Sequence, residues 1–210
     1  MSTLNLQKAK RIVKYFFKIN IYFIEVSKIN QKLIKTRIIA TLGIFLLSFP
    51  SHFVYQLFPS ILISFFFPVN ESIFEHLKIL FTSTIIYGLI DYLILKKEQI
   101  QFHNFSFSLF LSSTLAVLIF LLFYLPLYYL IGEFLPLTLL LMLLTYALCQ
   151  LISYYILSTK EIPYLNSLSI LLIILIYLNF IILTFSPPKE ELFKDPITNT
   201  YGFKKEQISP

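Results

Sequence analysis

Four side chains that can do chemistry lie within eight residues of one another, in a chain that is otherwise poor in charge. They are two carboxylates, an imidazole and an ammonium, contributed by Glu71, Glu75, His76 and Lys78. A second imidazole, His52, lies upstream, and residues 38–70 carry no formal charge. Charged groups within apolar segments are costly and usually have a partner or a task. The stretch from Pro68 to Lys78 is therefore the first place to look for a functional site.

The residue types favour a site that binds a divalent metal and works by acid–base chemistry. Imidazole and carboxylate are suitable metal ligands, and a metal with an open position can activate water. The candidate metal ligands are His52, His76 and Glu71, and the candidate catalytic residues are Glu75 as general base, with Glu71 and His76. The candidate substrate-binding residues are Lys78, Asn70 and Tyr55. A shared metal requires the two histidines to lie within about 8 Å of each other, because metal–ligand bonds are ~2 Å long.

Two other interpretations of these residues stay open. Membrane-embedded acids and histidines also relay protons or bind cations in transporters. Alternatively the residues are structural: Glu75 and Lys78 have the i to i+3 spacing of an ion pair, Glu71 serves a helix dipole, and His76 sits at the headgroup level. The spacing matches no recognised metal-binding motif. The sequence alone does not decide between these interpretations.

The composition is that of a membrane protein. Of the 210 residues, 57% are hydrophobic and 13% are charged, and the mean hydropathy is +0.78. An ordinary soluble domain carries about 25% charged residues. The bilayer is the natural solvent for so much apolar surface. The lone Cys149 excludes an internal disulfide and a cysteine-based metal knuckle.

The hydrophobic pattern predicts an all-α, polytopic transmembrane bundle of about five spans, between residues 36 and 186. The expected spans are 37–57, 71–95, 106–131, 135–158 and 164–185. Asn70 is the expected N-cap of the second span. The proline-bounded segment 59–69 is expected to be a loop or a re-entrant piece, which needs protein or water around its backbone.

The second span is expected to be the central helix, because it carries two polar stripes. The first stripe comprises Glu71, Glu75, Lys78 and Thr82, and the second comprises His76, Ser83 and Tyr87. Near the other end of this span, Asp91 is expected to pair with Lys96 or Lys97. In the third span, the tyrosines at 124, 128 and 129 are typical of an interfacial aromatic belt rather than of a ligand cage.

Residues 1–35 form a basic segment, and nine of the 17 Lys and Arg fall between Lys8 and Arg37. Apolar residues recur there at spacings of three or four, which predicts an amphipathic helix on anionic lipid headgroups. Nucleic-acid binding is the disfavoured alternative, because the chain offers no soluble platform. Basic residues near short loops also place the N-terminus in the cytoplasm, which puts the polar stretch and the C-terminus outside the cell membrane.

The C-terminal tail, residues 187–210, mixes aromatic residues with turn formers at Asp195-Pro196 and Tyr201-Gly202. Such aromatic residues are poorly placed in water. The tail is therefore expected to fold over the outer face of the bundle, near the stretch from Pro68 to Lys78.

Three blocks of residues resemble a known family. They are Ser51-His52-Phe53-Val54-Tyr55, the stretch from Pro68 to Lys78, and the tail motifs Pro187-Pro188, Leu192-Phe193, Asp195-Pro196 and Tyr201-Gly202. Together they resemble small bacterial multi-pass membrane proteins catalogued as domain of unknown function 6512. The resemblance covers about residues 38 to 203 and departs from the family pattern at Phe74, where that pattern has Trp. It implies a multi-helix membrane protein and no particular activity.

The leading functional hypothesis is an outward-facing polar site, covered by the tail, that hydrolyses or modifies a lipid-linked substrate with a divalent metal. A small transporter or carrier subunit that couples a cation, and an accessory protein without chemistry of its own, are the alternatives.

Overall fold

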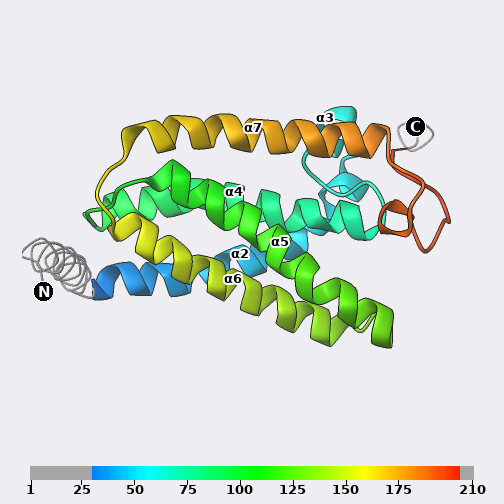
Figure 1. Cartoon of the computed structure of the whole chain (residues 1–210), viewed down its shortest axis with the longest axis horizontal. Coiled ribbons are helices and arrows are strands. Elements are labelled where there is room, and N and C mark those ends of the chain that lie inside the picture. The colour runs from blue at the N-terminus through cyan, green and yellow to red at the C-terminus, as the bar shows by residue number, and fades with distance from the viewer. Residues whose placement is uncertain (1–29, 204–210) are drawn as a thin grey trace, which may run out of the picture.

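The computed structural model describes residues 30–203, which form a bundle of helices (Figure 1). The helices are α2 (Gln31–Leu57), α3 (Ile61–Ser64), α4 (Ile73–Lys97), α5 (Phe105–Ile131), α6 (Leu135–Ser158), α7 (Pro163–Phe185) and the short 3-10 helix η1 (Glu191–Phe193). All but α3 and η1 are long and apolar enough to cross a membrane, which makes five candidate spans. The predicted all-α polytopic bundle is confirmed.

The last three spans begin and end within one residue of the predicted bounds, whereas the first begins earlier than predicted. The helix α2 starts at Gln31 because the Asn30 side chain caps it, with Oδ1 accepting from Leu33 N at 3.2 Å. Residues 31–35, predicted as part of the interfacial segment, are thus the first turn of this span. The rest of that amphipathic segment lies outside the described residues.

The helix α4 is central to the bundle, as predicted. It packs against α2 and α5, and α6 closes a ring by packing against both of these helices. In an apolar 18-residue stretch of α4, 61% of the residues are buried, against 17–28% in the corresponding stretches of the other four spans. Gly43 of α2 lets α2 and α4 approach closely, because a Cβ at this position would overlap the Tyr87 ring of α4. The fifth span, α7, lies along the outside of this ring (Figure 1).

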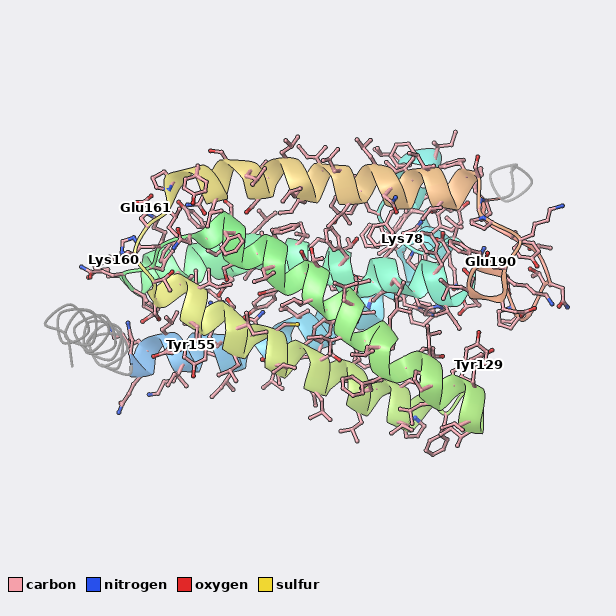
Figure 2. All side chains as sticks on the ribbon, viewed as in Figure 1. Lys78, Tyr129, Tyr155, Lys160, Glu161 and Glu190 are labelled. Atoms are coloured by element: carbon pink, nitrogen blue, oxygen red, sulfur yellow. The ribbon has the colours of Figure 1, made fainter. Side chains whose placement is uncertain are left out.

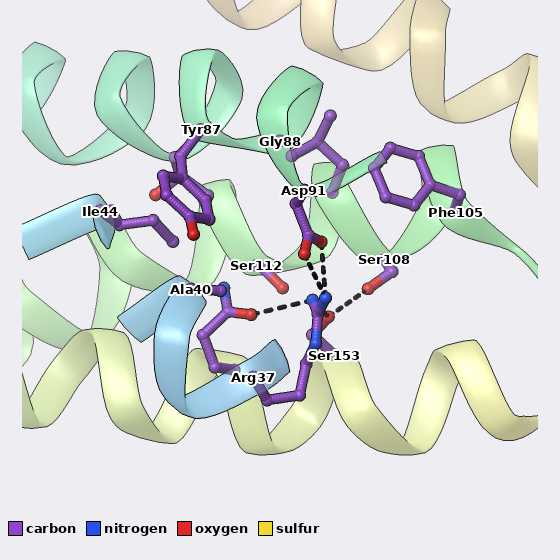
Figure 3. A pocket seen from close by; sticks show the side chains of 13 residues that line it. Arg37, Ala40, Ile44, Tyr87, Gly88, Asp91, Phe105, Ser108, Ser112 and Ser153 are labelled. Atoms are coloured by element: carbon purple, nitrogen blue, oxygen red, sulfur yellow. Dashed lines mark hydrogen bonds and ion pairs between the residues drawn. The ribbon is translucent and has the colours of Figure 1, made fainter. Parts of the chain in front are cut away.

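A bidentate ion pair joins α2 to α4 in the half of the bundle where α2 begins (Figure 3). The Arg37 guanidinium donates to both carboxylate oxygens of Asp91. It also donates to Gln150 Oε1 and Ser153 Oγ, each at 3.1 Å. The predicted pairing of Asp91 with Lys96 or Lys97 is therefore wrong. The lysines lie on the exposed end of α4 itself, whereas the guanidinium reaches the buried face of Asp91 from a neighbouring helix.

The segment between α2 and α4 is held down by α4 side chains. Lys78 Nζ donates to the carbonyl of Ser64 at 2.9 Å and to that of Phe67 at 3.4 Å. Thr82 Oγ1 donates to the carbonyl of Phe66 at 2.8 Å. These bonds give hydrogen-bond partners to backbone carbonyls in a largely non-helical segment that lies against membrane-spanning helices. Such a segment is tolerated at membrane depth only when its backbone polar groups have partners.

Candidate metal centre

The polar stretch turns sharply before α4 begins. Asn70 Oδ1 accepts from Ser72 N at 2.9 Å, and Ser72 Oγ in turn accepts from Glu75 N at 3.3 Å. Ser72, not Asn70, is thus the N-cap, and the helix starts two residues later than predicted. As a consequence Glu71 precedes the helix and does not share a face with Glu75. It turns instead towards the histidines.

His52, Glu71 and His76 form a compact cluster that we call the His–Glu cluster. Glu71 Oε1 lies 3.7 Å from His52 Nε2, and Glu71 Oε2 lies 3.4 Å from His76 Nε2. The two imidazole rings stack with their centroids 5.1 Å apart. One ligand atom from each residue lies within 4.8 Å of the others. The cluster therefore meets the distance condition for a shared metal, with donor types that suit a divalent transition metal.

The surroundings orient these donors. His76 Nδ1 donates to the carbonyl of Ser72 at 2.9 Å, which directs Nε2 towards Glu71. Gln56 Nε2 donates to Glu71 Oε1 at 3.4 Å from the next turn of α2. Outer partners of this kind fix the direction of ligating imidazoles and carboxylates.

Glu71 is held in its charged form. Hydrogen bonding from His76 is the largest influence on its pKa and lowers it, helped by the charges of the two imidazoles and opposed by partial burial. A carboxylate that stays ionised is available as an acceptor or as a metal ligand. The side chains of the cluster are 24–34% exposed, so ions and small molecules can reach them.

The cluster faces a cavity of about 580 Å³. Its walls come from α2, α4, α5, α6 and the C-terminal tail. In Figure 1 the α5–α6 hairpin diverges from α4 and the tail at this end of the bundle. Most of the lining is apolar, and it includes the buried side chains of Leu80, Phe120 and Met142. The charged residues of the lining are half-buried or exposed. A cavity of this size and composition suits a ligand with one polar end and one apolar end.

Glu75 and Lys78 lie elsewhere, and neither lines this cavity. They form an ion pair at 2.7 Å with side-chain exposures of 1% and 0%, and Figure 2 places Lys78 inside the bundle. Glu75 also accepts from Val69 N at 3.0 Å and from Thr184 Oγ1 at 2.8 Å. Both groups are fully engaged in joining α4 to the preceding segment and to α7. This is the structural ion pair that the i to i+3 spacing allows.

The two other candidate substrate contacts also face protein. Asn70 Nδ2 donates to the Gly202 carbonyl of the tail at 3.1 Å. Tyr55 is 4% exposed, its hydroxyl has no hydrogen-bond partner, and its ring lies 6.4 Å from that of Phe203. Of the seven candidate residues, the structure thus brings together His52, Glu71 and His76 and sets the other four apart.

The tail lies against the start of α4 and the end of α7. The Phe193 ring is 4.7 Å from that of Phe74, and Phe203 N donates to the Thr184 carbonyl at 2.9 Å. Gly202 has φ +60° and lies so close to Thr184 that a Cβ would overlap its carbonyl. Glu191 and Lys194 of the tail line the cavity. The tail is therefore part of the cavity wall.

Three further cavity residues were not identified from the sequence: Tyr124, Tyr128 and Glu133. Tyr129 is 70% exposed, as expected for an aromatic belt, but Tyr124 and Tyr128 line the cavity. A signal was present in the sequence, because Glu133 is the sole charged residue between 105 and 158. Because Glu133 lies between Gly132 and Phe134, where two predicted spans meet, its position is typical of an ordinary turn residue. Only the packing of the helices places it in the cavity wall.

Comparison with known proteins places the chain in one family. A family model described as "Family of unknown function (DUF6512)" matches residues 24–203, so the chain belongs to that family. The match begins earlier than the predicted residue 38 and includes part of the basic N-terminal segment. No match was found among curated proteins or among solved structures.

Proposed function

We propose that this member of a family without an assigned activity is a membrane-embedded, metal-dependent enzyme that hydrolyses or modifies a lipid-linked substrate. The observation that carries the proposal is the His–Glu cluster. It offers two imidazoles and a carboxylate within 4.8 Å of one another, in the wall of a cavity whose lining is mostly apolar. Three protein ligands with an open fourth position are the usual arrangement of catalytic zinc.

Each residue of the cluster has a distinct task in this proposal. His52 and His76 bind the metal through Nε2, and the carbonyl of Ser72 keeps the His76 ring in place. Glu71 binds with one oxygen and accepts a proton with the other. A metal held there would supply a bound water with its pKa lowered to ~7 as the nucleophile for an ester or phosphoester bond. The apolar depth of the cavity holds the hydrocarbon part of the substrate.

The charge distribution supports a site on the outer side of the membrane. Figure 2 labels Lys160 and Glu161 at one end of the bundle and Glu190 at the other. At the end where α2 begins lie five exposed lysines of the described chain, Lys32, Lys35, Lys96, Lys97 and Lys160. The opposite end has Lys189, which is exposed, Lys194, which is half-buried, and Lys78, which is buried. Basic residues favour the cytoplasmic side. The His–Glu cluster and the tail are at the less basic end.

Metal content of the purified full-length protein tests the proposal. We expect about one transition-metal ion per chain by elemental analysis, and its loss in His52→Ala/His76→Ala. His103→Ala is the matched control, because it removes the third histidine of the chain, which is exposed and lies at the other end of the bundle. The proposal would be overturned if wild type were purified without metal and if adding metal back did not raise its thermal stability.

A cation carrier is the second candidate. Buried hydroxyls and the Arg37–Asp91 pair make the other half of the bundle polar, which a carrier needs. However, the guanidinium neutralises Asp91, which is the one buried carboxylate in this half among residues 30–203, so it is not free to bind a passing cation. Uptake of a labelled divalent cation into proteoliposomes, lost in Asp91→Asn at a temperature below the Tm of that variant but not in Glu98→Gln, would favour the carrier over the enzyme.

A further inference from the structure

The cavity that the His–Glu cluster faces has a rim of two different kinds. Among residues 30–203, seven residues that line the cavity are also exposed. Three of them are apolar and belong to membrane-spanning helices: Phe49 and Phe53 of α2, and Leu135 of α6. The other four belong to the turn after α5 and to the tail: Glu133, Glu191, Pro196 and Asn199. The rim is therefore apolar on the helices and mostly polar beyond their ends.

The apolar part of the rim reaches into the depth of the membrane. Phe49 lies eight residues before the end of α2 at Leu57, which is about 12 Å along the helix axis. Its side chain is nevertheless 41% exposed. Surface that is exposed at this depth of a membrane-spanning helix meets hydrocarbon rather than water. The cavity therefore opens to the bilayer at Phe49.

This opening lies between α2 and α6. The cavity residues that α4 and α5 contribute are all buried or half-buried, so the wall on their side is closed. Towards the start of α2, Ser48 Oγ lies 2.8 Å from the hydroxyl of Tyr146, and this hydrogen bond joins α2 to α6. Ser48 is the lining residue of α2 that lies farthest from the polar part of the rim. The bond therefore marks the inner limit of the opening.

The His–Glu cluster lies where the two parts of the rim meet. His52 directly precedes Phe53, and it lies three residues beyond Phe49, which is about 4.5 Å along the helix axis. Beyond it come the polar side chains of the turn and of the tail. A lipid whose hydrocarbon chain lies at Phe49 thus has its polar linkage beside His52 and its headgroup at the tail.

We infer that the substrate is a lipid of the surrounding leaflet that enters the cavity sideways, between α2 and α6. Its hydrocarbon chain passes Phe49, Phe53 and Leu135, and its ester or phosphoester linkage lies at the His–Glu cluster. A lipid that reached the cavity from water would first expose its chain, at a free-energy cost that grows with every methylene group. This inference rests on the proposed function, because it names the substrate class of the same site and its route of entry.

Tryptophan fluorescence of the full-length protein in vesicles tests this inference. The chain has no tryptophan, so a single introduced indole is the only one. Phe120→Trp places it in the cavity wall, at a residue that is 4% exposed. The vesicles contain phosphatidylcholine with or without bromine on the acyl chains, because bromine quenches an indole on contact. We expect Phe120→Trp to show at least half the quenching of Leu130→Trp, which is 79% exposed on the same helix.

Tyr55→Trp is the matched control. Tyr55 is also 4% exposed, but it does not line the cavity, and its hydroxyl has no hydrogen-bond partner among residues 30–203 to lose. An indole there should be barely quenched by brominated lipid. Tyr124→Trp, at a half-buried residue of the cavity wall, repeats the test if Phe120→Trp does not fold. Quenching of the cavity variants no greater than that of Tyr55→Trp would overturn the inference.

A bulky maleimide on the rim tests the route of entry. Cys149 is 1% exposed, so in the folded protein the label reacts with an introduced thiol instead. In the Phe120→Trp protein, labelled Phe53→Cys should remove most of the quenching by brominated lipid. Labelled Leu46→Cys should not, because Leu46 is exposed on α2 but does not line the cavity. Equal quenching with the two labels would overturn entry between α2 and α6.

Two further arms identify the source of the ligand and separate this inference from the metal proposal. Iodide, which stays in water, should quench Phe120→Trp no more than Tyr55→Trp; strong quenching by iodide without quenching by brominated lipid would overturn the assignment to a lipid. His52→Ala/His76→Ala should lose metal but keep the quenching of Phe120→Trp. Lipid entry into a chain without metal refutes the metal proposal alone, whereas a metal-bound chain without lipid quenching refutes this inference alone.

Discussion

Replacing Lys78 by Met should destabilise the protein strongly while leaving the metal site intact. The substitution keeps an unbranched side chain of similar length but removes an ammonium that is 0% exposed. That ammonium donates to Glu75 and to the carbonyls of Ser64 and Phe67. Breaking a buried ion pair by removing one partner costs about 3–5 kcal/mol, because the remaining charge stays buried without compensation. For a chain of this size, that corresponds to a decrease in Tm of roughly 6–20 °C.

The chain provides its own reporter for this experiment. Cys149 is the single cysteine and is 1% exposed, so a thiol-reactive fluorescent dye labels it when the bundle opens. Lys97→Met, at the exposed end of the same helix, is the control and should shift Tm by less than about 2 °C. Glu75→Gln/Lys78→Met should recover part of the loss, since the double variant leaves no buried charge unpaired. A Tm for Lys78→Met within 2 °C of wild type would refute the reasoning.

Two other predictions concern charged groups at opposite ends of the bundle. Asp91→Asn leaves the Arg37 guanidinium buried without its carboxylate, so the dye assay should show a decrease in Tm comparable to that of Lys78→Met, whereas Glu98→Gln on the exposed end of α4 should show almost none. Metal affinity should fall as the pH is lowered, by up to about 100-fold per pH unit once both imidazoles take up protons, because those protons compete with the metal for the two ligands. The carboxylate of Glu71 stays ionised between pH 7.5 and 5, because its ordinary pKa of 4.5 already lies below that range and its pKa here is lower still. Isothermal titration between pH 7.5 and 5 measures the slope, and an affinity independent of pH would exclude imidazole ligands.

The spans could be predicted from sequence because each is a long apolar segment bounded by a charge, a proline or a glycine. Hydropathy measures this directly, so the bounds of α5 and α6 agree to within one residue. The start of α4 could not be fixed in the same way. Asn70 and Ser72 are both good N-caps, and the choice depends on which side chain receives Glu75 N, a contact that helix periodicity does not encode.

The two-residue difference between the predicted and the observed start of α4 determines which side chains Glu71 lies beside. A helix beginning at Glu71 places this acid above Glu75, whereas a helix beginning at Ile73 releases it towards His52. The three residues of the His–Glu cluster were nevertheless predicted together from residue type as candidate metal ligands, since the chain has few imidazoles and carboxylates. The Arg37–Asp91 pair and the wall around Glu133 were missed because both depend on which helices are neighbours, and spacing along one helix carries no information on that.

Burial and partner count distinguish the charged groups that hold this bundle together from those available for chemistry. Glu75 and Lys78 are at most 1% exposed, and their charged atoms have partners on three segments of the chain. A group satisfied in this way has no capacity left for a ligand. Glu71 and His76 are instead about a third exposed, at a separation of 3.4 Å that leaves room for an ion to be coordinated between them and the other imidazole. Partial exposure in the wall of a cavity, rather than charge density along the sequence, is what makes this cluster the candidate site.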